Sequence, residues 1–250
     1  MPENVLESLK PYIPFLAVFI SAIMIAIVII AFFWYKDKYE REPVSLIIAM
    51  FVWGVIAAII SMFIEGGIAS AVDHFTFNVI LAPFIEELLI AIGLILMSRH
   101  KEYEGVMDGM VYGISVGAGF VFLRNLTYGL SLLGTVSLLE AVSAVLLQSI
   151  LVPIAHPFFA AWFGAEIGRT KLPKLAKKKE PVPVNPVVTI IIAFITVFLF
   201  HGLWNLAGIY SPTELLHATV NSIIVLILFI CLFYSKFKEA RILEWIYRGK

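Results

Sequence analysis

Charged side chains are scarce in this sequence. Asp, Glu, Lys and Arg make up only 14% of its 250 residues, and they balance to a net charge of zero. The scarcity excludes an ordinary soluble domain, in which about a quarter of the residues are charged, and the balance gives no basis for a nucleic-acid partner. Cys231 is the single cysteine, so no disulfide can form within the chain. Residues 1–14 lack the pattern of a cleavable signal peptide, and we expect the first apolar segment to be retained.

Long apolar runs take the place of the missing charge. Hydrophobic residues form 61% of the sequence, and nearly uncharged runs of about eighteen or more residues indicate membrane-spanning helices. The ten-residue alternation typical of a transmembrane barrel does not occur. The sequence therefore predicts an all-α fold, a single transmembrane helical domain over residues 1–250 with about seven spans. The expected spans are 14–35, 44–64, 76–98, 107–128, 145–168, 186–209 and 215–235.

The basic residues lie almost entirely on one side of these spans. Sixteen of the 18 Lys and Arg residues follow the first, third, fifth and seventh spans, which predicts an outer N-terminus and a cytoplasmic C-terminus. The basic loop at 169–185 and the tail at 236–250 are then cytoplasmic. Aromatic and basic residues alternate in the tail, which favours a short helix lying on the inner surface of the bilayer. We expect a multi-pass protein of the cell membrane.

A few polar side chains interrupt the apolar runs, and ionisable groups in lipid are costly and usually functional. Counted from the cytoplasmic ends of their spans, four of these groups lie about 20–24 Å deep: Glu86, Arg124, His156 and His201. Four helices should therefore present them at one level, in the outer half of the bilayer. The set is Glu86, Glu87, Arg124, His156, His201 and Asn205.

Two histidines and two glutamates from separate helices suit a zinc site. Three protein ligands leave one position for water, and a spare carboxylate takes that water's proton. Asn205 shares a helix face with His201, so it is a candidate either to donate to an oxyanion or to orient the imidazole. For each histidine taken alone, an interhelical hydrogen bond is the competing interpretation.

Small and helix-breaking residues surround this set. Glycines at four-residue spacing over 109–117 predict close helix packing. Pro153 and Pro157 stand on either side of His156, and they should interrupt the backbone hydrogen bonds of the expected span 145–168. Free carbonyls would then lie near the polar level.

Several motifs in order resemble a known family. They are DKYEREP at 37–43, APFIEELL at 82–89, DGMVYGISVGAGF at 108–120, His156, and HGLWN at 201–205. Over about residues 37–205 the chain resembles the PrsW family of intramembrane metalloproteases, which is akin to the CAAX prenyl endopeptidases. The resemblance implies cleavage of another membrane protein, typically an anti-sigma factor in bacteria. It also implies a paired-glutamate motif at Glu86 and Glu87, metal ligands at His156 and His201, and assistance from Asn205.

Two positions depart from the family pattern. Ile90 stands where the family has Lys, and Arg124 stands where it has a second acidic residue. We expect Arg124 to supply the missing counter-charge by a bidentate pair with Glu86 or Glu87. A fixed cation also repels a metal ion and competes for its carboxylates.

The leading hypothesis is an intramembrane zinc protease that cuts single-span membrane proteins near the outer leaflet. His156, His201 and one glutamate of the pair, Glu86 or Glu87, hold Zn²⁺, the other glutamate acts as general base, and Asn205 stabilises the oxyanion. The alternatives are a natural pseudoprotease or an engineered inactive variant that binds membrane proteins without cutting them. A transporter, channel or receptor remains a further class, although residues 215–235 contain no lysine for a retinal Schiff base.

Overall fold

The computed structural model describes residues 10–37, 41–151, 156–172, 185–209 and 215–248. Every named element within these ranges is a helix, which confirms the all-α bundle. The long helices are α2 (Ile13–Lys36), α3 (Val44–Ile68), α4 (Ala82–Met97), α5 (Val106–Leu132), α6 (Leu138–Leu151), α7 (His156–Arg169), α9 (Pro186–Ile209) and α10 (Leu215–Arg248). A 3₁₀ turn at Lys10–Tyr12 leads into α2, and a π-helical stretch at Thr76–Leu81 leads into α4.

Five described segments are long and apolar enough to cross a membrane, so this is a multi-pass membrane protein. They are Lys10–Lys36, Val44–Ile68, Thr76–Met97, Val106–Leu132 and Pro186–Ala207. Large apolar side chains of α2, α3 and α9 point outward, whereas carboxylates and imidazoles lie inside. This is the arrangement expected where the surroundings are lipid rather than water.

Two boundaries differ from the sequence-based expectation. The expected span 145–168 is divided between α6 and α7. Pro157 is the second residue of α7, a position where its missing N–H costs no hydrogen bond, and Pro153 lies outside the described residues. The expected surface helix in the tail is also not separate, because α10 continues to Arg248 as one helix.

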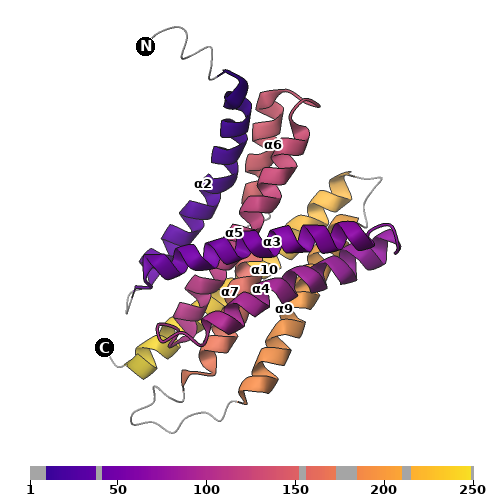
Figure 1. Cartoon of the computed structure of the whole chain (residues 1–250). Coiled ribbons are helices and arrows are strands. Elements are labelled where there is room, and N and C mark those ends of the chain that lie inside the picture. Colours follow the sequence, from indigo (N-terminus) through magenta and orange to yellow (C-terminus); the bar gives the residue numbers. More distant parts are fainter. Residues whose placement is uncertain (1–9, 38–40, 152–155, 173–184, 210–214, 249–250) are drawn as a thin grey trace, which may run out of the picture.

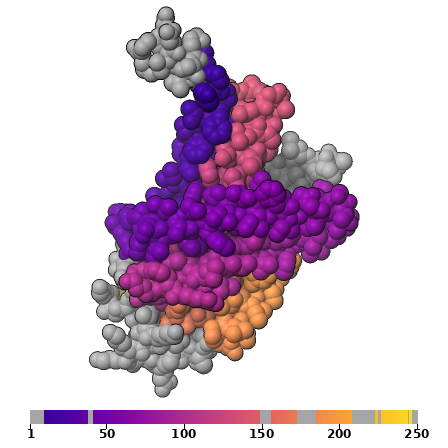
Figure 2. Space-filling model, viewed as in Figure 1, coloured from indigo at the N-terminus to yellow at the C-terminus, as the bar shows by residue number. Residues whose placement is uncertain are grey.

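Helix α5 forms the centre of the bundle. It packs against α2, α3, α6 and α7, and 94% of the residues in its most apolar stretch are buried. In Figure 1, α2 and α6 extend together to one end of the molecule, while α3 and α4 run side by side across the remaining helices. Figure 2 shows α3 covering the middle of this face. The residues brought in by α5 are therefore enclosed by neighbouring helices.

The glycines of α5 allow the close approach of α7, as their spacing predicted. A Cβ atom added at Gly113 would lie 2.3 Å from the carbonyl oxygen of Ala160. One added at Gly117 would lie 2.5 Å from the Cα of Pro157. Real Cβ atoms do not approach so closely, so only glycine permits this contact. The packing seats the first residue of α7, His156, directly against α5.

Candidate metal centre

Four helices bring the predicted polar residues together. Helix α4 carries Glu86 and Glu87, α7 begins with His156, and α9 carries His201. All four side chains are buried. Arg124 of α5 reaches the same group and keeps 36% of its side chain exposed. The common depth counted along separate spans thus corresponds to real proximity.

Glu86 and the two histidines form a triangle of potential ligands. The Oε2 atom of Glu86 lies 3.6 Å from Nε2 of His156 and 3.7 Å from Nε2 of His201. One ligand atom from each of the three residues lies within 4.8 Å of the others. A tetrahedral zinc ion holds its nitrogen and oxygen ligands about 3.3 Å apart. The donor set and its spacing therefore fit a zinc ion after small adjustments.

Glu87 contacts the opposite edge of both imidazoles. Its Oε1 atom lies 3.0 Å from Nδ1 of His201 and 3.6 Å from Nδ1 of His156. The two rings stand nearly perpendicular, at 86°, with centroids 4.5 Å apart. A carboxylate that receives the Nδ1 proton of a histidine fixes the tautomer in which Nε2 is free to bind a metal. One glutamate of the pair thus faces the metal position, and the other faces away from it.

Arg124 bridges two carboxylates on different helices. Its Nη2 lies 3.0 Å from Oε1 of Glu86, and its Nη1 lies 2.9 Å from Oε2 of Glu65. The expected pairing with Glu86 is present, but the bidentate fork is wrong, because each nitrogen serves a different residue. Glu65 is buried near the end of α3.

Sequence reasoning missed Glu65 because the expected second span ended at residue 64. Helix α3 continues to Ile68, which brings Glu65 inside the bundle. The available signal was Arg124 itself, since a guanidinium has enough N–H donors for more than one carboxylate. The group therefore contains three carboxylates, Glu65, Glu86 and Glu87.

Asn205 and Ile90 have structural surroundings of their own. The Nδ2 atom of Asn205 donates to the carbonyl oxygen of Asn78, at 2.8 Å, and so joins α9 to the π-helical stretch before α4. Ile90 is fully buried in the main apolar core. Position 90, where the family that the sequence resembles has Lys, is thus an ordinary packing position in this chain. Among the described residues, the only guanidinium or ammonium contact of Glu86 comes from Arg124 on α5.

Aromatic rings pack against both imidazoles of the centre. The ring of Phe120 lies 5.2 Å from that of His156, and the ring of Phe159 lies 5.9 Å from that of His201. Apolar walls of this kind exclude bulk water and strengthen the electrostatic interactions inside.

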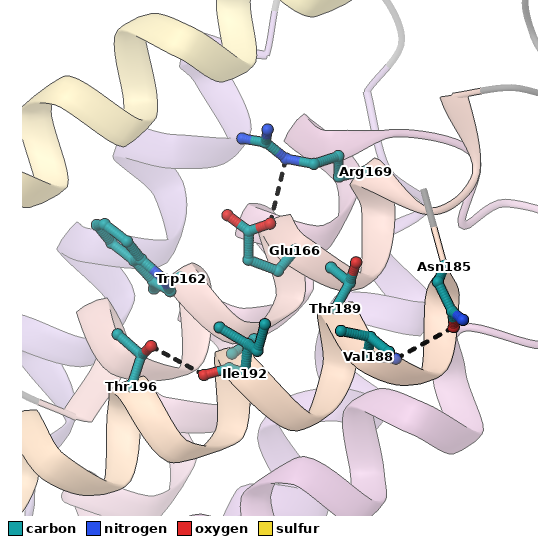
Figure 3. A pocket seen from close by; sticks show the side chains of 9 residues that line it. Trp162, Glu166, Arg169, Asn185, Val188, Thr189, Ile192 and Thr196 are labelled. Carbon is teal, nitrogen blue, oxygen red and sulfur yellow. Dashed lines mark hydrogen bonds and ion pairs between the residues drawn. The ribbon is translucent and has the colours of Figure 1, made fainter. Parts of the chain in front are cut away.

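A cleft of about 430 Å³ between α7 and α9 lies elsewhere. Figure 3 shows Trp162, Glu166 and Arg169 on one side of it and the first turns of α9 on the other. Glu166 is ten residues beyond His156 on the same helix, a rise of about 15 Å. The cleft therefore opens at the other end of α7, and none of its lining residues belongs to the metal centre.

A second buried acidic group lies near the start of α3. Asp37, Glu42 and Asp108 bring carboxylate oxygens within 4.8 Å of one another, and the Tyr112 hydroxyl donates to Glu42. Burial and the neighbouring Asp108 carboxylate raise the pKa of Glu42 to about 9. Glu42 is therefore protonated at neutral pH and does not add to the charge of this group.

Comparisons with known proteins agree with the geometry. A family model described as PrsW family intramembrane metalloprotease matches residues 42–234. "Protease PrsW" of Geobacillus kaustophilus is 27% identical over 186 residues, which cover 72% of this chain and 74% of that protein. "Protease PrsW" of Oceanobacillus iheyensis is 25% identical over 209 residues, covering 80% and 88% respectively. The Bacillus subtilis protein of the same name is 28% identical over 116 residues, covering 45% and 53%. No solved structure matches the chain.

Proposed function

Since the chain belongs to the PrsW family of intramembrane metalloproteases, we propose that it is a zinc-dependent protease that cleaves single-span membrane proteins near the outer leaflet. The observation that carries this proposal is the triangle formed by Glu86, His156 and His201. It combines three zinc-type ligands from three helices in a buried site. A bound zinc ion supplies Lewis acidity that activates water and polarises the scissile carbonyl.

In this proposal Glu86, His156 and His201 hold the metal through Oε2 and the two Nε2 atoms. Glu87 receives the Nδ1 proton of His201, 3.0 Å away, and its Oε1 lies 3.6 Å from Nδ1 of His156, so both Nε2 atoms stay turned toward Glu86. Glu87 is not needed as a ligand, and because it lies on the Nδ1 side of the imidazoles its position supports an orienting role more directly than a role as general base.

Asn205 supports the centre from α9. One amide hydrogen is used in the contact with Asn78, and the second is the donor that we assign to the oxyanion of the tetrahedral intermediate. Through the first contact, Asn205 also fixes the distance between His201 and the helix that carries the glutamates.

We also propose the orientation with an outer N-terminus and a cytoplasmic C-terminus. Its support is the position of the basic residues, which places the loop at 169–185 and the tail at 236–250 in the cytoplasm. Single cysteines placed in the 171–179 loop, in a Cys231→Ser background, should react with an impermeant maleimide only after cells are opened. Labelling of intact cells would reverse the orientation.

Metal analysis of the purified full chain tests the function most directly. We expect about one zinc ion per chain and cleavage of a single-span substrate that stops on chelation and returns with zinc. His156→Ala and Glu86→Gln should lose both metal and cleavage. A chain without stoichiometric metal, whose cleavage survives chelation, would exclude the zinc site.

A matched pair of substitutions separates the two glutamates. Glu87→Gln keeps an oxygen that accepts from Nδ1 but loses the negative charge that makes the imidazoles better ligands. An orienting role therefore predicts a loss of zinc affinity of up to about 10–100-fold and recovery of cleavage at saturating zinc. A general-base role predicts that cleavage stays absent at saturating zinc. In Glu86→Gln the ligand itself is impaired, and more zinc should not restore activity.

A pseudoprotease is the second candidate, and the contact between Arg124 and Glu86 favours it. A guanidinium on a ligand carboxylate competes with a metal ion for the same charge. In that case the present chain binds a membrane protein without cutting it, and Arg124→Glu, which introduces the family's acidic residue, should start cleavage. Cleavage by the unmodified chain would exclude this candidate.

A further inference from the structure

Glu65 pairs with Arg124 and so offsets the positive charge that lies beside the metal position. It belongs neither to the expected ligand set nor to the motifs quoted for the family. Arg124 places one nitrogen on Oε2 of Glu65 and another on Oε1 of Glu86. The carboxylates of Glu65 and Glu86 are 8% and 4% exposed, so water solvates neither charge to any large extent. The guanidinium is therefore shared between a carboxylate inside the metal triangle and one outside it.

The sharing assigns separate tasks to the two oxygens of Glu86. Oε1 is occupied by Arg124, and Oε2 faces the Nε2 atoms of His156 and His201. A carboxylate anchored through one oxygen keeps the other in a fixed direction, as neighbouring hydrogen bonds do for metal ligands in general. Arg124 can serve as this anchor because Glu65 holds it in place from α3.

The charges lead to the same assignment. Glu65, Glu86 and Glu87 contribute three negative charges and Arg124 one positive charge. Two negative charges remain, which equal the charge of one divalent cation when the imidazoles are neutral. Without Glu65, Arg124 would leave only one, and the buried centre would carry excess positive charge once a metal is bound.

We infer that Glu65 is a positioning residue that neutralises Arg124 and thereby lets Glu86 bind a divalent metal beside a fixed guanidinium. The inference rests on the proposed function, because it concerns the affinity of that site. It predicts that Glu65 and Arg124 act as one unit. Zinc should bind more tightly when both charges are present, or when both are removed, than when Arg124 is present without Glu65.

Zinc titration of the full chain in lipid nanodiscs, against a chelator of known affinity, tests this unit. Glu65→Gln should weaken zinc binding by about tenfold or more, because an unbalanced cation then lies beside the ligand carboxylate. The double variant Glu65→Gln/Arg124→Gln should return to the wild-type affinity. Arg124→Gln keeps an amide donor for Oε1 of Glu86 and removes the cation, so alone it should bind zinc at least as tightly as wild type.

Ser61→Ala is the control for α3. Its hydroxyl is buried one turn before Glu65 and bonds to Ala58 in the same helix, so zinc affinity should not change. A purely structural role for Glu65 predicts that the double variant is worse than either single variant, whereas a charge role predicts recovery.

Each result decides the inference. Unchanged affinity in Glu65→Gln, or additive losses in the double variant, would overturn it while leaving the metalloprotease in place. A wild-type chain that binds no zinc would overturn both. If Glu65→Gln alone does not fold, the double variant decides. A double variant that binds zinc with the wild-type affinity supports the inference, and one that binds zinc at least about tenfold more weakly than wild type overturns it.

Discussion

Removing the guanidinium of Arg124 should destabilise the protein even when no metal is present. In the wild-type chain the carboxylates of Glu65 and Glu86 each lie within about 3 Å of the guanidinium. Arg124→Ala leaves both of them buried without a cation. Breaking a buried ion pair costs about 3–5 kcal/mol. Since 36% of the Arg124 side chain is exposed, solvent reduces the loss to about 3 kcal/mol, the low end of this range. For a chain of this size the Tm should fall by about 6–12 °C.

Arg169→Ala is a matched control. Arg169 is also an arginine between two carboxylates, Glu166 and Glu239, and its side chain is 30% exposed. These partners are 15% and 38% exposed, and Lys236 also pairs with both of them, so neither carboxylate loses its last cation. The expected loss is about 0–1 kcal/mol.

The assay is thermal unfolding of the metal-free chain in detergent, followed by the fluorescence of its tryptophans, with chelator present throughout. A difference of several degrees between the two alanine variants supports burial of the Arg124 network. Equal melting temperatures would refute the reasoning and would mean that Arg124 extends to the outer headgroups.

Three further outcomes follow from particular contacts. Gly117→Ala should displace the start of α7, lower zinc affinity and reduce stability by about 1–3 kcal/mol. Gly66→Ala is the control and should have none of these effects, because nothing lies within 4 Å of a Cβ added there. Zinc titrations and melting curves check both variants. Glu42, with its pKa raised from 4.5 to about 9, binds more protons folded than unfolded, so its contribution to stability is full below pH 4.5 and is lost as pH rises toward 9. Glu42→Gln should flatten this dependence in melting curves recorded across that range, and an unchanged slope would contradict the assignment. Asn205→Ala should break the contact with Asn78 and lower kcat more than it raises KM, whereas a reversed split would place Asn205 in substrate binding.

Much of the site could be predicted because lipid makes polar residues informative. Glu86, His156 and His201 stand out in apolar runs, and helical geometry converts their positions along the spans into a common depth. Which oxygen or nitrogen faces which partner depends on how the helices are rotated about their axes. Periodicity within nearly uniform apolar helices does not determine this rotation, so the different sides taken by Glu86 and Glu87 required the structure.

The fold was predictable in class and less so at its boundaries. Apolar length indicates a span, but the expected span 145–168 is divided between α6, which ends at Leu151, and α7, which begins at His156, and hydropathy alone does not place these two ends. Glu65 was lost through the same weakness, since the end of α3 had to be placed to within one residue.

Helix α5 has a consequence for how the protein is made. Its mean hydropathy of 1.6 is the lowest of the five candidate spans, which otherwise range from 2.4 to 3.1, and it carries Arg124 and a glycine-rich face. Alone in the bilayer, such a segment would expose a charge and poorly covered backbone, and its insertion would be weakly favourable. Helix α3 precedes it from the ribosome and offers Glu65 and the close contact at Gly54. The pairing of α3 with α5 therefore serves biogenesis as well as the mature site: an early helix retains a late one that could not remain in lipid without it.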